Sequence, residues 1–338
     1  MKSIGIIGLG KMGILHSGIL NSQPDVKIVA ICENHSLMMR FAKSILPREI
    51  KFYGNHLEMI SAVELDAVVI TTPINTHIPL VLDLAKANRD LSVFVEKPLA
   101  STGSQAQAAC DAVKDLRGIH MVGFQKRFSP VFQRAKKLLS DGELGEPLFF
   151  RAYTFSSDVL HESSAWRFKS GGGVLLDLAP HLLDLLLWFF GMPESVLAVR
   201  ERIYSRQVDD YVHATLSFPS GVKGHMDACW CMPDFRLPEI MIEVYGKRGS
   251  FTVTDDVLKV DVDRDGKRTR ETYYKQSFDV PISYLLADPE FTLQDENFIR
   301  SFSEKKLPET NFHESSKVNF IIDQIVSQSA LETQGARR

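Results

Sequence analysis

The chain has 338 residues, of which 44% are hydrophobic and 24% are charged, a composition typical of a globular protein with room for two domains. Its formal net charge is −3 and its four cysteines are scattered, which argues against a nucleic-acid partner, an anionic membrane surface and a disulfide framework. We expect no signal peptide, because an apolar strand begins almost at Met1, and we expect a reducing cytoplasm as the location.

The first element predicted is a strand, a glycine turn and a helix. An apolar run over residues 4–7 predicts a buried strand, and Gly8, Gly10 and Gly13 then give the pattern G-x-G-x-x-G before a helical apolar pattern. Gly8 permits a tight turn, Gly10 lets backbone approach a pyrophosphate, and Gly13 lets helix and strand pack closely. We therefore expect a dinucleotide on this helix N-terminus, bound by Gly8, Gly10, Lys11, Met12 and Gly13.

The second strand is predicted over residues 27–32 and is followed directly by Glu33, about twenty residues beyond the last glycine. A carboxylate at this position accepts hydrogen bonds from the ribose hydroxyls and repels a 2′-phosphate. The first arginine after it, Arg40, is seven residues further on. The sequence therefore favours NAD over NADP.

Strands and helices alternate over residues 1–124, with strands that end near Ile7, Cys32, Ile70, Val95 and Gly123. Such alternation predicts a doubly wound parallel sheet, and hence a dinucleotide-binding domain over 1–124. Ligands of these sheets bind beyond the carboxyl ends of the strands. The candidate residues after the strands are Glu33, Thr71, Thr72, Pro73, Asn75, His77, Glu96, Lys97 and Arg127.

A second α/β domain is predicted over residues 125–333, starting with a linking helix over 128–145. Successive strands without intervening helices indicate a mostly antiparallel sheet. The predicted strands span 147–156, 196–204, 210–218, 222–232, 239–245, 250–254 and 258–262. Helices are predicted over 173–190, 293–303 and 314–331, and residues 334–338 are expected to be a disordered tail.

Two polar groups on the helix predicted over 173–190 are candidates for proton transfer. Asp177 and His181 lie four residues apart, so they share one helix face, and a carboxylate beside a histidine tunes its pKa toward neutrality. Spacing alone leaves open that they satisfy each other in the core. Lys97 follows a strand at the predicted cofactor edge, where it could polarise a substrate oxygen or be an ordinary surface lysine.

Other polar residues carry weaker signals. Cys229 and Cys231 lie in an apparent strand and are expected to be small buried residues rather than metal ligands, and no metal site is predicted. Arg151, together with Arg167 and Lys169, could contact an anionic sugar or be solvated surface charges.

Four motifs taken together resemble the glucose–fructose oxidoreductase, inositol dehydrogenase and MocA-like family. They are Gly8-x-Gly10-x-x-Gly13, Thr72-Pro73 with His77, Glu96-Lys97-Pro98, and Gly171-Gly172-Gly173 with Asp177 and His181. The resemblance covers essentially the whole chain. It implies a Rossmann domain followed by an α/β domain whose large antiparallel sheet forms a homodimer or homotetramer contact through its open face.

The resemblance also assigns roles to residues. It implies that Lys97, Asp177 and His181 surround the substrate, with His181 as general base, and that Glu96 lies near the nicotinamide ribose. The residues that it places along the cofactor or near cofactor and substrate are Thr72, Pro73, Asn75, His77, Arg127, Trp166 and Arg167. The expected activity is hydride transfer between NAD and a secondary alcohol of a sugar, polyol or nucleotide-linked sugar.

Some features depart from the family pattern. Pro180 removes a helix N–H just before His181 and is expected to kink the helix. Gln125-Lys126 also differs from the residues usual there, which leaves the substrate open. Two alternatives remain from the same resemblance, namely an NAD-dependent glycosidase and a catalytically inactive, cofactor-sensing regulator.

Overall fold

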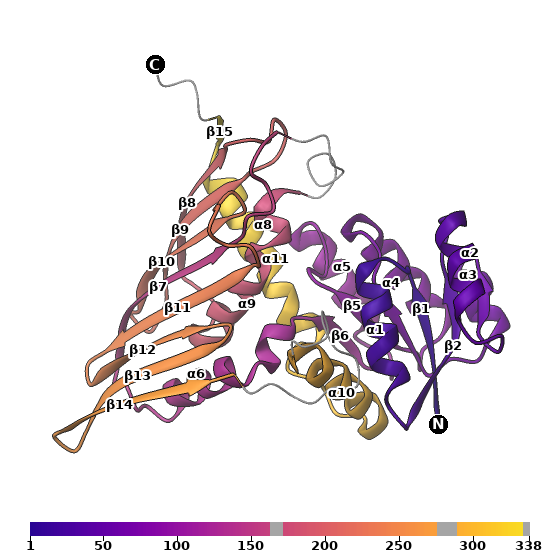
Figure 1. The fold of residues 1–338 in the computed structure, drawn as a ribbon, viewed down its shortest axis with the longest axis horizontal. Coiled ribbons are helices and arrows are strands. Elements are labelled where there is room, and N and C mark those ends of the chain that lie inside the picture. Colours follow the sequence, from indigo (N-terminus) through magenta and orange to yellow (C-terminus); the bar gives the residue numbers. More distant parts are fainter. Residues whose placement is uncertain (163–171, 276–288, 334–338) are drawn as a thin grey trace. The chain divides into compact units, whose positions relative to one another are not determined.

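The computed structural model describes residues 1–162, 172–275 and 289–333 (Figure 1). The chain divides into two units. Unit 1 comprises Met1–Gln125 and a later segment that holds α10 (Pro289–Glu304) and ends at Ser316, whereas unit 2 begins at Lys126 and resumes at Lys317. The first crossing between the units lies one residue beyond the predicted boundary, but the chain then returns to unit 1 once more. Neither unit is therefore a single stretch of sequence.

Unit 1 is built on a six-stranded parallel sheet of order β3-β2-β1-β4-β5-β6, which confirms the predicted doubly wound fold. The strands are β1 (Lys2–Ile7), β2 (Val26–Cys32), β3 (Lys51–Tyr53), β4 (Ala67–Ile70), β5 (Ser92–Glu96) and β6 (His120–Gly123). Its central strands are continuous apolar runs because helices cover both faces. All four residues of β4 are buried, as are the last four of β1.

The helices of unit 1 follow the strands in turn. They are α1 (Lys11–Asn21), α2 (Ser36–Ile45), α3 (His56–Ala62), η1 (Ile74–Thr76), α4 (His77–Ala87), α5 (Gly103–Val113) and, later in the chain, α10. Helix α1 packs beside α10, while α3, α4 and α5 contact one another in sequence. Side chains cap the N-termini of three of these helices by accepting backbone N–H groups: His35 caps α2, Asn55 caps α3 and Thr102 caps α5.

Unit 2 is built on a nine-stranded, mostly antiparallel sheet of order β14-β13-β12-β11-β7-β10-β9-β8-β15, as predicted in type. The pairs β10–β7 and β15–β8 are parallel. The strands are β7 (Pro147–Phe155), β8 (Ser195–Arg202), β9 (Tyr211–Ser217), β10 (Lys223–Cys229), β11 (Glu239–Gly246), β12 (Gly249–Thr254), β13 (Val257–Arg264), β14 (Lys267–Tyr274) and β15 (Leu331–Thr333).

Helices lie against one face of this sheet (Figure 1). They are α6 (Pro130–Ser140), α8 (Gly173–Asp177), α9 (Ala179–Phe190) and α11 (Phe312–Gln328), and the short helix η2 (Gln125–Phe128) precedes α6. In strand β7 the buried Phe150 and Ala152 alternate with Phe149 and Arg151, which are exposed. Arg151 therefore lies on the sheet face opposite the helices.

Three sequence predictions for unit 2 were wrong in detail. The single helix expected over 173–190 is interrupted at Leu178, two residues before Pro180, which stands in the first turn of α9. The helix expected to reach residue 331 ends at Gln328, and Leu331–Thr333 instead pairs with β8. Strand β14 was not predicted, because its sequence is strongly polar along an edge of the sheet.

Some predictions fall on residues outside the described part of the chain. These are the tail 334–338, Gly171, and the candidate contact residues Trp166, Arg167 and Lys169. Among the described residues, no helix is long and apolar enough to cross a bilayer.

Candidate active site

The glycine turn between β1 and α1 has the geometry expected for a dinucleotide site. Gly8 has a φ of +92°, and a Cβ on it would lie 2.7 Å from Thr72 Cγ2, so the turn requires glycine there. A Cβ on Gly13 would lie 2.1 Å from the carbonyl oxygen of Gly8, which shows how closely helix and turn pack. Gly10, in contrast, has no other described atom within 4 Å of its Cβ position.

The open position at Gly10 is what a bound pyrophosphate needs. Gly10 is the N-cap of α1 and no side chain caps that helix, so its first N–H groups are available to an anion. Lys11 and Met12 form the first turn, where Lys11 is exposed and Met12 is half-buried. The site thus offers a cradle in which phosphate oxygens could replace the missing cap.

Glu33 is held directly beside this turn. Its Oε2 accepts the backbone N–H of Leu9 at 2.7 Å, and its Oε1 accepts the N–H of His35 at 2.7 Å. These two bonds fix the carboxylate at the carboxyl end of β2. A carboxylate has about four acceptor sites, so the ribose hydroxyls can still donate to it.

The threonines after β4 brace the glycine turn. Thr71 donates its hydroxyl to the carbonyl of Gly8 at 2.8 Å, and its N–H donates to the carbonyl of Ile7 at 2.9 Å. Thr76 donates to the Thr72 hydroxyl at 2.7 Å. Pro73 and Asn75 are exposed at this edge.

His77 joins two of the loops that sequence analysis singled out. Its ring is 2% exposed, with Nδ1 3.0 Å from the carbonyl oxygen of Pro98 and Nε2 2.9 Å from that of Thr72. Burial lowers the pKa of His77, which favours a neutral ring. His77 is therefore a buried link between the two loops that carry Thr72 and Lys97.

Lys97 projects from the loop that follows β5 and is half-buried. Its backbone N–H donates to Oε2 of Glu96 at 3.1 Å, and the Lys97–Pro98 peptide bond is cis. Glu96 itself is 7% exposed and its Oε1 lies 2.9 Å from Nε2 of His16. Two histidines thus hold the Glu96-Lys97-Pro98 motif, His16 at Glu96 and His77 at the carbonyl of Pro98.

In unit 2, Asp177 is the last residue of α8 and His181 lies in the first turn of α9, so the helix break falls between them. Both are partly exposed. The start of α8 is fixed by Asp209, whose Oδ1 accepts the N–H of Leu175 at 3.0 Å and whose carbonyl accepts that of Val174 at 2.9 Å. A Cβ on Gly173 would lie 2.2 Å from Asp209 Oδ1, so glycine is needed for this contact.

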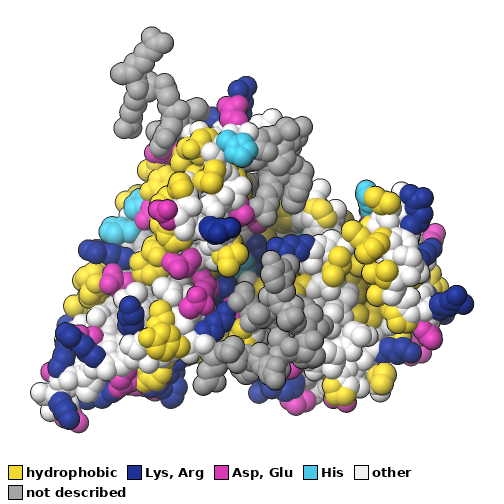
Figure 2. Space-filling model, viewed as in Figure 1, with side chains coloured by type: hydrophobic (Ala, Val, Ile, Leu, Met, Phe, Trp, Pro, Cys, Tyr) yellow, Lys and Arg dark blue, Asp and Glu magenta, His cyan; other side chains and the backbone are white. Residues whose placement is uncertain are grey.

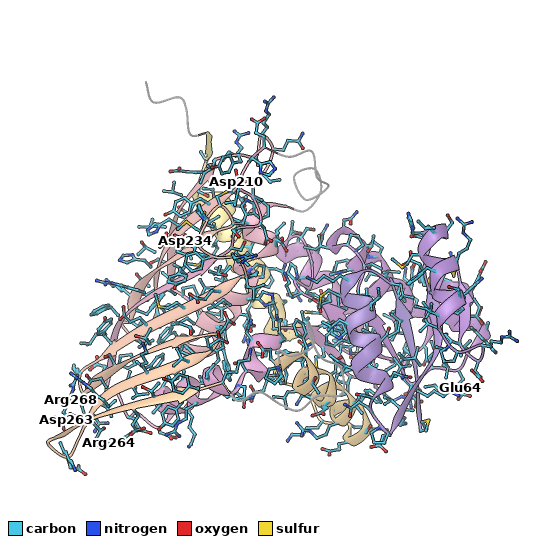
Figure 3. The ribbon with its side chains drawn as sticks, viewed as in Figure 1. Glu64, Asp210, Asp234, Asp263, Arg264 and Arg268 are labelled. Carbon is cyan, nitrogen blue, oxygen red and sulfur yellow. The ribbon has the colours of Figure 1, made fainter. Side chains whose placement is uncertain are left out.

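Asp210, labelled in Figure 3, organises the neighbouring loop. One of its oxygens accepts the N–H groups of residues 203, 204 and 205, each at 2.7 Å, and the other accepts the indole N–H of Trp230 at 2.7 Å. Sequence analysis missed both Asp209 and Asp210. A pair of acids directly before a strand was the only signal that the sequence carried.

Arg127 is committed to an ion pair within unit 2. Its Nε and one terminal nitrogen each donate to Asp184 at 2.7 Å, and the two side chains are 7% and 1% exposed. The guanidinium also lies 5.7 Å from the ring centre of Trp188. This bidentate pair fastens η2 to α9, the helix that begins just before His181.

A polar cavity of about 630 Å³ also lies in unit 2, where α6 ends and β13 turns into β14. Figure 3 shows Asp263, Arg264 and Arg268 near this hairpin. Arg264 is paired with Glu143 and Glu271, so its charge is already neutralised. None of the residues that line the cavity is a predicted site residue. Within the described ranges, no group of three or more potential ligands is arranged to hold a metal ion.

Comparison with known proteins identifies the family. Residues 2–124 match the oxidoreductase family NAD-binding Rossmann fold, and residues 132–252 match the GFO/IDH/MocA C-terminal domain. The chain belongs to the GFO/IDH/MocA family. It is an NAD-dependent oxidoreductase acting on CH–OH groups, as its relatives of this family are.

Several members of the GFO/IDH/MocA family are similar over much of the chain. The scyllo-inositol 2-dehydrogenase (NAD(+)) of Bacillus subtilis is 29% identical over 73% of this chain and 72% of its own. The myo-inositol 2-dehydrogenase of Thermotoga maritima is 31% identical over 66% and 67%, and the levoglucosan dehydrogenase of Pseudarthrobacter phenanthrenivorans is 26% identical over 98% and 97%.

Among solved structures, levoglucosan dehydrogenase in complex with NADH and levoglucosan superposes with a TM-score of 0.86 at 26% identity. The superposition covers 97% of this chain and 96% of that chain. It confirms the predicted pairing of a Rossmann domain with a C-terminal α/β domain, and NAD as the cofactor.

Proposed function

We propose that this protein oxidises a secondary alcohol of a sugar or cyclic polyol, with Lys97, Asp177 and His181 as the residues that surround the substrate. The proposal rests on two motifs that are held in place by hydrogen bonds, Glu96-Lys97-Pro98 and the α8–α9 junction with Asp177 and His181. The relatives of the chain include sugar and polyol dehydrogenases. Lys97 is set by Glu96, and the α8–α9 junction is set by Asp209.

The residues of unit 1 fit the cofactor. The uncapped N-terminus of α1 and the open position at Gly10 would take the pyrophosphate, and Glu33 would accept from the ribose hydroxyls. NAD, when bound, supplies the acceptor for a hydride. Glu33 also disfavours a 2′-phosphate, which is the basis for proposing NAD rather than NADP.

Each polar residue around the substrate has one role in the proposal. The Lys97 ammonium donates to the substrate oxygen and stabilises the negative charge that develops on it. His181 removes the hydroxyl proton as general base, and Asp177 orients the imidazole and stabilises its protonated form.

Measuring both kcat and the Kd for NADH distinguishes residues that act on the substrate from residues that bind the cofactor. Lys97→Ala and His181→Ala are expected to lower kcat at least a hundredfold on any inositol or sugar that reduces NAD, with the Kd for NADH within about twofold of wild type. Lys86→Ala, at an exposed lysine of unit 1, and His56→Ala, at a half-buried histidine paired with Asp83, serve as matched controls. Loss of NADH binding in His181→Ala would contradict its role as a base.

Wild-type behaviour tests the reaction class. Growth of absorbance at 340 nm with NAD and a polyol supports the proposal. Glycoside cleavage without net NADH formation would instead support the glycosidase alternative. Tight NADH binding with no turnover on a panel of inositols, aldoses and anhydrosugars would support the regulator.

We also propose that two copies of the chain associate through the sheet face of unit 2 that lies opposite the helices. Outward positions on this face include Phe149, Leu197 and Val199, which are 41%, 67% and 43% exposed, and Phe149 stacks on Tyr245 at 4.5 Å. Figure 2 shows apolar side chains among charged ones over this unit. Leu197→Glu should lower the molar mass measured by light scattering, whereas an unchanged mass would exclude this face. A cytoplasmic location stays a prediction.

A further inference from the structure

Three titratable side chains form a buried triad in unit 1: His16 of α1, Glu96 at the end of β5, and Asp295 of α10. The Nε2 atom of His16 lies 2.9 Å from Glu96 Oε1, and its Nδ1 lies 2.8 Å from Asp295 Oδ2. His16 is completely buried, and Glu96 and Asp295 are 7% and 3% exposed. The triad is therefore shielded from water on all three members.

The contacts within the triad favour a protonated ring on His16. Both ring nitrogens of His16 face carboxylate oxygens, and a neutral imidazole has only one N–H to donate. Burial by itself lowers the pKa of His16, but the attraction and hydrogen bonds of Asp295 and Glu96 outweigh it and raise the pKa to about 10. Burial also raises the pKa of Asp295, but the charge and hydrogen bond of His16 oppose that rise. With both carboxyls ionised, one imidazolium and two carboxylates carry a net charge of −1.

A net charge is an unusual way to hold elements together. Taking an uncompensated charge out of water is unfavourable, and neutral hydrogen-bonding side chains could tie α1, β5 and α10 equally well. Gln294 donates an amide N–H to Asp295 Oδ1 at 3.4 Å, but an amide is uncharged and so leaves the net charge unchanged. A cationic group near the triad would offset the cost of burying this negative charge.

The position of Glu96 indicates what that cation is. In a sheet of order β3-β2-β1-β4-β5-β6 a dinucleotide lies across the carboxyl ends, with one nucleotide on each half. Glu33 follows β2 and is proposed above to serve the adenosine half. Glu96 ends β5 on the other half, so the triad lies beneath the nicotinamide half of the site. The nicotinamide ring is cationic in NAD⁺ and neutral in NADH.

We propose that the buried triad is an electrostatic element of the cofactor site that makes the protein bind NAD⁺ in preference to NADH. This inference rests on the NAD site and on the placement of Glu33 in the proposed function. The negative charge attracts the oxidised ring and has no counterpart on the reduced ring. It therefore also favours departure of NADH after the alcohol has been oxidised, and product release limits the turnover of many enzymes.

Asp295→Asn tests the inference, because it removes one charge while keeping the shape and an acceptor for the ring N–H. We measure Kd for NADH by fluorescence titration and Kd for NAD⁺ by competition, both without substrate. Kd for NAD⁺ should rise about tenfold, the effect of one charge several ångströms away in a partly buried site, while Kd for NADH stays within twofold. Asp83→Asn, which alters a surface carboxylate paired with His56 at 2.9 Å, is the matched control.

A double variant separates charge from structure. His16→Gln with Asp295→Asn removes one positive and one negative charge, so the net charge returns to that of wild type. The ratio of the two Kd values should then return to within about twofold of wild type. If the double variant shifts the ratio as far as Asp295→Asn does, or if the single variant changes both Kd values equally, the triad is only structural and the proposal is overturned.

Folding and activity are read separately. Circular dichroism and Tm report whether Asp295→Asn folds. If Asp295→Asn does not fold, Glu96→Gln removes a negative charge from the other end of the triad. Loss of a contact between Glu96 and the ribose would raise the Kd for NAD⁺ and the Kd for NADH equally, because both cofactors carry the same ribose. Because no sugar is present, a protein that turns over no polyol but still prefers NAD⁺ would refute the proposed reaction and leave this inference standing.

Discussion

The glycine turn allows a paired prediction in which two alanine substitutions have opposite effects. In Gly13→Ala the new Cβ would lie 2.1 Å from the Gly8 carbonyl oxygen, whereas ordinary contact starts at 3.4 Å. The turn must therefore open by more than about 1 Å, and such overpacking costs about 1–3 kcal/mol. In Gly10→Ala the Cβ meets no described atom, and φ of −69° with ψ of −170° suits alanine.

The magnitudes follow from these contacts. For a unit of this size each kcal/mol moves Tm by about 2–4 °C, so Gly13→Ala should melt about 2–12 °C below wild type. Gly10→Ala gives up the preference for glycine over alanine at an N-cap, about 0.5–1 kcal/mol, but the smaller conformational entropy of the unfolded alanine chain offsets about 0.4–1 kcal/mol, so its Tm should stay within about 2 °C of wild type. Its methyl group, however, occupies the path of the pyrophosphate, and Kd for NADH should rise at least tenfold, or about 1.4 kcal/mol.

Thermal melting by circular dichroism and titration with NADH test the pair. Gly10→Ala that binds NADH like wild type would show that the pyrophosphate does not approach the backbone there. A wild-type Tm for Gly13→Ala would refute the packing argument. Loss of stability in Gly10→Ala would mean that the open position is filled.

Three further predictions concern single side chains. Glu33→Gln should reduce the preference for NAD over NADP, measured as the ratio of the two Kd values, and unchanged selectivity would mean that another group reads the ribose. Asp184→Ala leaves the buried Arg127 charge without its carboxylate and should lower the free energy of unfolding by about 3–5 kcal/mol in urea, while Arg127→Met with Asp184→Leu should recover most of it. Burial lowers the pKa of His120 to about 4, so the unfolded chain binds a proton between pH 6.5 and 4 that the folded chain does not. Stability should therefore fall by up to about 3 kcal/mol as the pH falls through that window, and His120→Phe should flatten the profile of Tm against pH.

The parts of the fold that local chemistry determines could be predicted from the sequence. The strand–glycine–helix start follows from Gly8 and Gly13, one of which needs positive φ and the other close packing. Apolar runs and alternation identified the two kinds of sheet. Proline at position 180 signalled a kink, and the helix is interrupted at Leu178; the start of α8, in contrast, is held by Asp209 from another part of the chain.

What could not be predicted depends on partners distant in sequence. His16 and Asp295 are separated by 279 residues, and no periodicity links them. Arg127 was placed near cofactor and substrate by resemblance, but the structure shows it in a buried pair with Asp184, 57 residues away. A histidine on the apolar face of the first helix was nevertheless a visible signal, because a buried polar side chain must find a partner.

The discontinuity of unit 1 has a consequence for the order of events during synthesis. The ribosome delivers β1 to β6 first, yet His16 waits for Asp295, which is made 279 residues later. At 5–20 residues per second that delay is on the order of tens of seconds. During this delay, the side of α1 that α10 will cover is exposed on the nascent chain. The strands and helices of unit 2 up to β14 are synthesised in the same interval. The cofactor-binding half begins to form first on the ribosome, but it cannot be completed until the chain has been made as far as Ser316.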